Sequence, residues 1–111
     1  STQVSVAGES NYGYSPDNAI KVGAFETQGK PRFNSNHKIY FSKLRGPNGE
    51  LVRYRRLGSC CHVESDNFPY GKAPLDRYEI AYEGLGESLI IYINMYDFEE
   101  PQAPIGLTLL D

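Results

Sequence analysis

Two neighbouring stretches with strand-like patterns place the strongest constraint on the fold of this chain. In residues 77–83, Tyr78, Ile80 and Tyr82 alternate with polar or small side chains, which is the period of two expected of a half-buried strand. Glycines mark a short turn after it, and residues 89–96 are apolar on both faces, which is typical of a strand covered on two sides. Because a turn of a few residues joins strands antiparallel, the sequence predicts a sheet built on this hairpin.

Three further strands are predicted around the hairpin. Residues 51–57 alternate as a half-buried strand, and residues 105–110 form a last strand. Residues 20–25 predict a short edge strand or an ordered arm. Between strands, residues 62–75 are rich in turn formers and helix or strand breakers, so we expect a long irregular loop there.

One helix is predicted over residues 35–45. Asn34, Ser35 and Asn36 supply N-cap side chains, while Gly46 suits a left-handed C-terminal cap and Pro47 prevents continuation. A strand remains the alternative for this segment, because its apolar residues are also strand formers. The predicted fold class is α+β, with a small, mostly antiparallel sheet and this one helix packed on one face.

The length of 111 residues allows one hydrophobic core and one domain. Residues 1–14 are rich in small polar residues and predict a flexible N-terminal tether left after removal of an export leader, with a cloning remnant as the alternative; residues 15–111 form the globular domain. No apolar run approaches the ~20 residues that span a bilayer, so no transmembrane segment is expected.

The charge pattern argues against nucleic-acid binding. The formal net charge is −3, from 14 acidic and 11 basic residues. The basic residues are scattered except for the short cluster Arg53, Arg55 and Arg56. Neutralising phosphates requires a concentrated basic face, so no nucleic-acid partner is expected.

One constellation suggests chemistry: the adjacent Cys60 and Cys61, followed at once by His62 and then by Glu64. Neighbouring Cα atoms lie ~3.8 Å apart, closer than the ~4.4–6.8 Å of ordinary disulfides, so a Cys60–Cys61 bond would be strained and reducible. Metal binding is a weaker interpretation because the spacing fits no standard site. Nucleophilic catalysis, with His62 or His37 as base, is also weaker, because Cys61 and His62 would point to opposite faces of a strand. The plain alternative is that both cysteines pack as small apolar residues. No catalytic residue and no cofactor is expected.

Candidate binding residues lie in the predicted loop 62–75, since long loops often carry function. The candidates are Asp66, Asn67, Phe68 and Tyr70. Other tyrosines, such as Tyr12 and Tyr14, suit either an adhesive surface or the core. The acidic group Asp97, Glu99 and Glu100 lacks the spacing of a calcium loop and predicts a solvated loop. Asn94 lies within an apolar strand, so its amide is expected to bond to and fix a neighbouring loop.

Several short segments resemble a family of small bacterial envelope proteins. They are IKVG at 20–23, RGPNGE at 45–50, RLGSCC at 56–61, LDRYE at 75–79 and YINMYD at 92–97, within a resemblance that spans about residues 11–109. Proteins of this kind are often predicted lipoproteins and frequently carry the name 2-dehydro-3-deoxyphosphooctonate aldolase. The resemblance implies a periplasmic or outer-membrane location and a lipid anchor on a cysteine preceding Ser1, and it leaves the activity open. The aldolase name is rejected, because such an enzyme resembles a TIM barrel of ~250 residues.

These observations favour a non-enzymatic binding or structural module of the bacterial envelope. Its partner is expected to be a protein or another envelope component, bound through the predicted loop and nearby tyrosines. Two alternatives remain open: a redox or metal-binding protein that uses Cys60 and Cys61, and an inhibitor or immunity protein that neutralises a secreted toxin.

Overall fold

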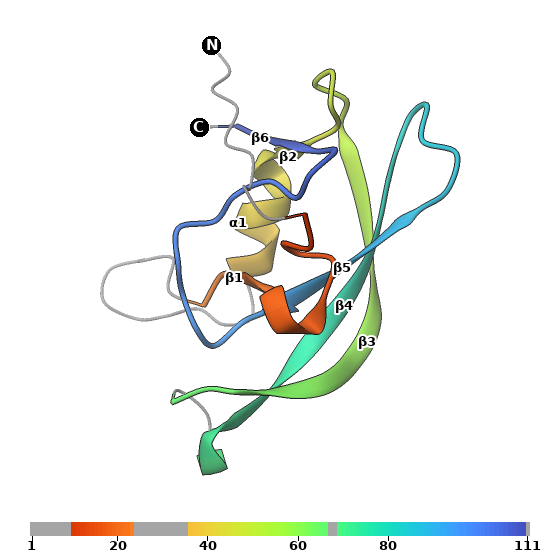
Figure 1. Ribbon diagram of the computed structural model, residues 1–111. Helices are drawn as coiled ribbons and strands as arrows, with labels where there is room; N and C mark the ends of the chain where they lie inside the picture. The colour runs from red at the N-terminus through yellow and green to blue at the C-terminus, as the bar shows by residue number, and fades with distance from the viewer. Residues whose placement is uncertain (1–9, 24–35, 67–68, 111) are drawn as a thin grey trace.

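The computed structural model describes residues 10–23, 36–66 and 69–110. The elements in chain order are η1 (Pro16–Asn18), β1 (Ile20–Lys21), α1 (Asn36–Lys43), β2 (Leu44–Arg45), β3 (Val52–Glu64), η2 (Pro69–Gly71), β4 (Lys72–Tyr82), β5 (Leu89–Asn94) and β6 (Thr108–Leu109). They form a four-stranded sheet in the order β1-β5-β4-β3 and a two-stranded sheet of β2 and β6. Helix α1 lies against one face of the larger sheet (Figure 1). The predicted α+β class is confirmed.

The larger sheet is built around a long, curved hairpin of β3 and β4 (Figure 1). These strands pair antiparallel from one end to the other, with register shifts at two bulges in β3. β5 pairs antiparallel with the other side of β4 and parallel with β1, which is the predicted edge strand. β1 ends at Lys21, Val22 forms only an isolated bridge with Phe98, and the rest of the predicted strand, from residue 24, lies outside the described residues. Tyr78 and Ile80 are buried, and their polar neighbours are less buried, as the alternation of residues 77–83 predicts.

Helix α1 forms where the sequence predicts it and ends for a different reason. After Lys43, the next two residues leave the helix and pair with Leu109 and Thr108 as β2. The left-handed cap predicted at Gly46 is wrong. The positive φ lies at Gly49 (89°), whose N–H donates to the Gly46 carbonyl at 3.1 Å. The predicted N-cap side chains, at positions 34–36, lie outside what the structure describes.

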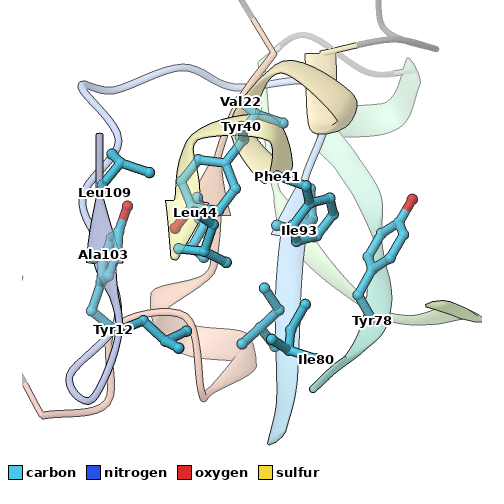
Figure 2. Close-up of a cluster of buried hydrophobic side chains, with 13 residues drawn as sticks. Tyr12, Val22, Tyr40, Phe41, Leu44, Tyr78, Ile80, Ile93, Ala103 and Leu109 are labelled. Atoms are coloured by element: carbon cyan, nitrogen blue, oxygen red, sulfur yellow. The ribbon is translucent and has the colours of Figure 1, made fainter. Parts of the chain in front are cut away.

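The core lies between α1, the larger sheet and the C-terminal segment (Figure 2). Phe41 packs against Tyr78 of the sheet, with ring centroids 4.9 Å apart, whereas Tyr40 points toward the C-terminal segment. Leu44, Ile80 and Ile93 are fully buried in the same cluster. Burying each large apolar side chain contributes about 1.5–3 kcal/mol. The Tyr40 hydroxyl donates to the Gln102 carbonyl at 2.7 Å. Burial raises the pKa of Tyr40 well above its ordinary value, so this hydroxyl stays protonated and keeps donating.

The long irregular loop predicted for residues 62–75 is wrong. β3 continues to Glu64 and β4 begins at Lys72, so the connection shrinks to residues 65–71. Pro74 lies inside β4 and lacks a backbone N–H. It is tolerated because it lies beyond the last pair of β4 with β5, Asp76 opposite Ile93, and next to a bulge in β3.

Two other strand predictions need correction. The last strand is only Thr108–Leu109 and belongs to the small sheet, because a turn at Gly106 (φ 96°) precedes it. β5 is also not covered equally on both faces. Ile91 and Ile93 are fully buried toward α1, whereas Ile90 on the other face is 37% exposed.

Part of the predicted tether is folded onto the domain. Tyr12 is buried in the core, and its hydroxyl accepts a hydrogen bond from the Gln102 N–H at 3.0 Å. The prediction of a flexible tether is therefore wrong for residues 10–14, and residues 1–9 lie outside the described residues. Within the described ranges, no helix is both long enough and apolar enough to cross a membrane.

Candidate functional site

Two adjoining grooves lie near the end of the β3–β4 hairpin that carries η2. The first, the hairpin groove, has a volume of about 530 Å³ and is lined by residues 64–66, residues 70–72 and Asp97. The second, the η1 groove, has a volume of about 370 Å³. It is lined by residues 62–64 of β3 together with Pro16, Asp17, Ala19, Lys21, Asn94 and Asp97. Because Glu64 and Asp97 line both grooves, the two grooves meet at these carboxylates.

A hydrogen-bonded cluster, here called the bracket, joins Ser65, Asn94, Tyr96 and Asp97 where the two grooves meet. The Asn94 side chain, 2% exposed, donates from Nδ2 to Asp97 Oδ2 at 2.9 Å. Its Oδ1 accepts from the N–H groups of Tyr96 and Asp97 at 2.8 and 3.0 Å. The hydroxyl of Ser65, the residue that follows β3, donates to Asp97 Oδ1 at 2.6 Å. The prediction that Asn94 fixes a neighbouring loop is confirmed.

Tyr70 lies at the rim of the hairpin groove with its side chain fully in solvent, at 102% relative exposure. Its backbone adopts φ 65° and ψ 13°, a left-handed conformation that non-glycine residues rarely take. The Ser65 N–H donates to the Gly71 carbonyl at 2.9 Å, which closes the connection below Tyr70. Of the other candidate binding residues, Asp66 is exposed and lines the same groove, while Asn67 and Phe68 lie outside the described residues.

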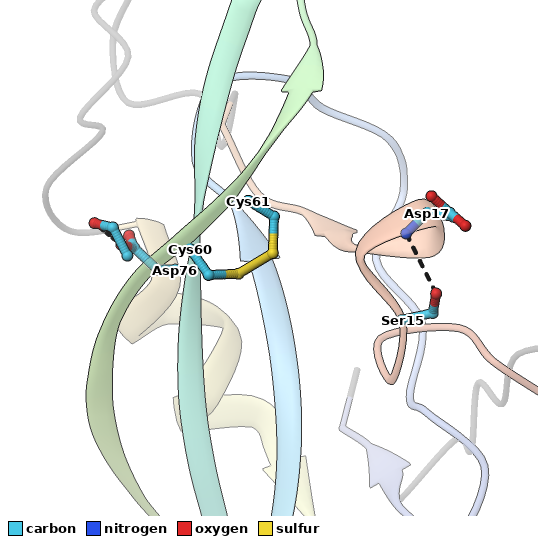
Figure 3. The surroundings of a disulfide bond; sticks show 6 residues. Ser15, Asp17, Cys60, Cys61 and Asp76 are labelled. Atoms are coloured by element: carbon cyan, nitrogen blue, oxygen red, sulfur yellow. Dashed lines mark hydrogen bonds between the residues drawn. A yellow bond between two sulfur atoms is a disulfide. The ribbon is translucent and has the colours of Figure 1, made fainter.

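Cys60 and Cys61 are joined by a disulfide between adjacent residues, with Cα atoms 3.8 Å apart. Cys60 lies opposite Leu75 and His62 opposite Pro74, so Cys61 is the extra residue of a β-bulge. Figure 3 shows the sulfur atoms projecting from β3 on the side of η1, opposite to Asp76. The alternative in which both cysteines pack as buried apolar residues is wrong, because Cys61 is exposed and Cys60 is half-buried.

The geometry gives no support to a metal site at this bulge. Both sulfur atoms are engaged in the disulfide, and His62 is exposed and lines the η1 groove. Among residues 10–23, 36–66 and 69–110, no group of three or more His, Cys, Asp or Glu side chains could hold a metal ion.

His37 lies on the opposite face of the sheet from the disulfide. Its ring stacks on Tyr78 at 5.5 Å and meets the edge of Phe41 at 6.4 Å. Its Nδ1 is buried and has no hydrogen-bond partner within the described part of the chain. Burial lowers the pKa of His37, Lys38 and Arg56 lower it further, and Asp76 opposes them. His37 therefore packs between α1 and the sheet and is not placed to act as a base for Cys60 or Cys61.

This environment makes stability depend on pH through His37. Because the folded pKa lies below the ordinary value of 6.5, the unfolded chain binds the proton more readily, and the free energy of unfolding falls as the pH drops below 6.5. We expect His37→Phe to reduce the difference in urea midpoint between about pH 7.5 and about pH 5.5. His62→Phe, at an exposed position of β3, should keep the wild-type difference. An equal loss of stability at low pH in wild type and His37→Phe would contradict the assignment.

The other candidate residues divide between site and scaffold. Glu99 and Glu100 are exposed as predicted, and Glu99 lies 3.9 Å from Lys21 Nζ. Asp97 is hydrogen-bonded in the bracket, so the prediction of a solvated loop is wrong for this residue. Tyr12 is in the core, and the half-buried Tyr14 donates its hydroxyl to the Ile105 carbonyl at 2.7 Å. Neither tyrosine offers a free adhesive ring.

The sequence predictions did not single out several residues that line the grooves, among them Asp17, Ser65 and Lys72. Ser65 and Asp97 are 32 residues apart in the chain, and their contact arises only when the hairpin folds back over the end of β5. The run of turn formers after Glu64 was the available signal for Ser65, and nothing local marked the other two.

No family model, no curated protein and no solved structure matches this chain.

Proposed function

We propose that this domain is a non-enzymatic binding module whose partner is a protein held at the hairpin groove. The observation that carries the proposal is Tyr70, a fully exposed aromatic side chain at the rim of a groove of about 530 Å³. Tyrosine is enriched in binding surfaces because it offers a large contact area at low conformational cost. The hairpin groove can accept a side chain of the partner, and the Tyr70 ring can pack against the partner surface beside the groove.

The rigidity of the groove supports this proposal. Asp97 accepts hydrogen bonds from both the Ser65 hydroxyl and the buried Asn94 amide, and the Ser65 N–H donates to the Gly71 carbonyl. A surface that is already ordered loses less conformational entropy on association than a loop that must first fold. The groove is therefore prepared to bind without rearrangement.

The charges of the groove favour a basic partner surface. Glu64, Asp66 and Asp97 line it together with one cation, Lys72. Glu64 and Asp66 are exposed, so they can meet basic side chains of the partner and increase the association rate. Charge complementarity would select the partner's orientation while Tyr70 supplies apolar contact.

The module is further proposed to act in an oxidising compartment such as the bacterial envelope. The pairing of both cysteines in one disulfide supports this location, because disulfides persist outside the reducing cytoplasm. Anchoring through a lipid on a preceding cysteine is part of the same proposal.

Site-specific crosslinking tests the binding surface. A photoreactive phenylalanine analogue placed at position 70 is expected to form a discrete adduct with a protein in cells of the native host. The same analogue at Leu51, which is 74% exposed in the segment before β3, is the matched control and should not form that adduct. Absence of an adduct at position 70, or the same adduct at both positions, would overturn the proposal.

With the partner in hand, Tyr70→Ala is expected to weaken binding about 30-fold, the effect of losing a hot-spot side chain of about 2 kcal/mol. The melting temperature should not change, because the ring is fully exposed. Leu51→Ala is the control for loss of an exposed apolar side chain. An unchanged Kd for Tyr70→Ala, measured by calorimetry, would remove Tyr70 from the binding surface.

A further inference from the structure

β3 contains two bulges that are built in different ways. At the first, between Arg56 and Gly58, the positive φ of 127° belongs to glycine, which adopts it without steric cost. At the second, between Cys60 and His62, the positive φ of 38° belongs to Cys61. A residue with a side chain persists in this region only when its surroundings hold it there. The disulfide to Cys60 is the covalent constraint at that point.

The second bulge determines where the end of the hairpin points. It is followed directly by His62, Val63 and Glu64, and these three residues line the η1 groove. Since side chains alternate along a strand, adding or removing one residue at the bulge reverses the face that each of the three occupies. Glu64 is one of these three residues and lines both grooves. Its position in the grooves therefore depends on the conformation of Cys61.

Pairing on the partner strand is weak at the same point. The residue opposite His62 is Pro74, which has no N–H to donate. β4 is no longer paired with β5 there, because the last pair between those strands is Asp76 opposite Ile93. The disulfide therefore braces the part of the hairpin that has the least support from the sheet.

We propose that the Cys60–Cys61 disulfide is a redox site for dithiol reductants, and that it holds the end of the hairpin in place only while it is oxidised. Cys61 is an exposed residue, which favours attack of a reductant on this side of the disulfide. Reduction frees Cys61 to leave the left-handed region, and residues 62–65 and 71–73 then lose their fixed pairing. Only the consequence for partner binding rests on the proposed function; the change in the hairpin does not.

The reductant supplies the electrons and protons for this thiol–disulfide exchange. A thiolate of the dithiol attacks Cys61 Sγ, a mixed disulfide forms, and the bond to Cys60 Sγ breaks, leaving a thiolate that takes up a proton. The second thiol of the reductant then attacks the mixed disulfide and releases Cys61 as a thiol. The protein gains two electrons and two protons, and the dithiol becomes a disulfide.

Alkylation and amide hydrogen exchange test both parts with dithiothreitol as the probe. Alkylation under denaturing conditions should modify neither cysteine before treatment and both cysteines after it. In the reduced protein, exchange at the N–H groups of Val63 and Ser65 should accelerate at least about tenfold, as expected when a local segment opens more easily. Exchange at Tyr78 and Ile80, in the core part of β4, should stay unchanged and serves as the internal control.

Two variants separate the backbone conformation from the covalent bond. Cys60→Ala/Cys61→Gly lacks the disulfide but tolerates a positive φ, so it should exchange like the oxidised protein. Cys60→Ala/Cys61→Val disfavours that φ and should exchange like the reduced protein. If both cysteines stay unmodified by alkylation after dithiothreitol treatment, the proposed redox site is overturned. Unchanged exchange on reduction, or equal exchange in the two variants, would overturn the role of Cys61 in holding the hairpin. Neither result bears on the Tyr70 crosslinking test.

Discussion

Replacing Asn94 with alanine is expected to lower the free energy of unfolding by about 3 kcal/mol, because several buried polar groups lose their partner at once. The Asn94 amide donates to Asp97 and accepts from the N–H groups of Tyr96 and Asp97, all within 3.0 Å. Alanine fills none of these roles and leaves a small void in a site that is 2% exposed. Urea denaturation, monitored by circular dichroism, measures the loss as a shift in midpoint.

The matched control for this experiment is Asn48→Ala. Asn48 is exposed in the turn before β3, so its replacement should change stability by less than about 0.5 kcal/mol. A loss for Asn94→Ala no larger than that of Asn48→Ala would show that the bracket does not stabilise the fold. Asn94→Ala should also lower the protection of the Ser65 N–H against hydrogen exchange, because Asp97 is the shared partner of Asn94 and Ser65.

Replacing Gly23 with alanine is expected to destabilise the fold by about 2–3 kcal/mol, the upper part of the range for overpacking. An added Cβ would lie 2.6 Å from the Tyr96 carbonyl carbon and 2.8 Å from the Met95 carbonyl oxygen. Both are backbone atoms that cannot rotate away. The Gly23 N–H also donates to the Asp97 carbonyl at 2.9 Å, so the segment cannot move outward without losing this bond. Thermal unfolding measures the effect.

Gly86→Ala provides the control for Gly23→Ala. Gly86 lies in the exposed turn between β4 and β5, its φ is not positive, and nothing lies within 4 Å of an added Cβ. This change should be neutral or slightly stabilising, because alanine reduces the entropy of the unfolded chain. Equal melting temperatures for the two variants would rule out close packing of Gly23 against residues 95–97.

Local patterns were sufficient to predict the parts of the fold that depend on local chemistry. The alternation around Tyr78 and Ile80 predicts β4, and the polar Asn94 inside an apolar run predicts a satisfied buried amide. The segment around α1 also has helix character over most of its length. Each of these depends on residues within a few positions of one another.

Long-range pairing explains what the sequence predictions missed. Pro74 and its neighbours suggest a loop, yet pairing with β3 carries β4 through them. Gly46 suggests a helix cap, yet pairing of Leu44 with Leu109 ends the helix first. At the candidate site, Tyr70 and Asp66 were identified from local composition. Ser65 was not, because its bond to Asp97 joins segments 32 residues apart, and Lys72 was not, because its place opposite Glu64 depends on the pairing of β3 with β4.

The outer position of β3 in the sheet also bears on self-association. A strand of 13 residues at the edge of a sheet could pair with a second chain and start a fibril. Arg53, Arg55 and Arg56 lie along this edge, where Arg55 pairs with Glu79 and Arg56 with Asp76 of β4, each at 2.9 Å, and two bulges bend the strand. Pairing two copies of β3 would bring like charges together and meet a mismatched ladder. We therefore expect the two bulges, together with the arginines, to disfavour edge-to-edge pairing of this strand with a second copy.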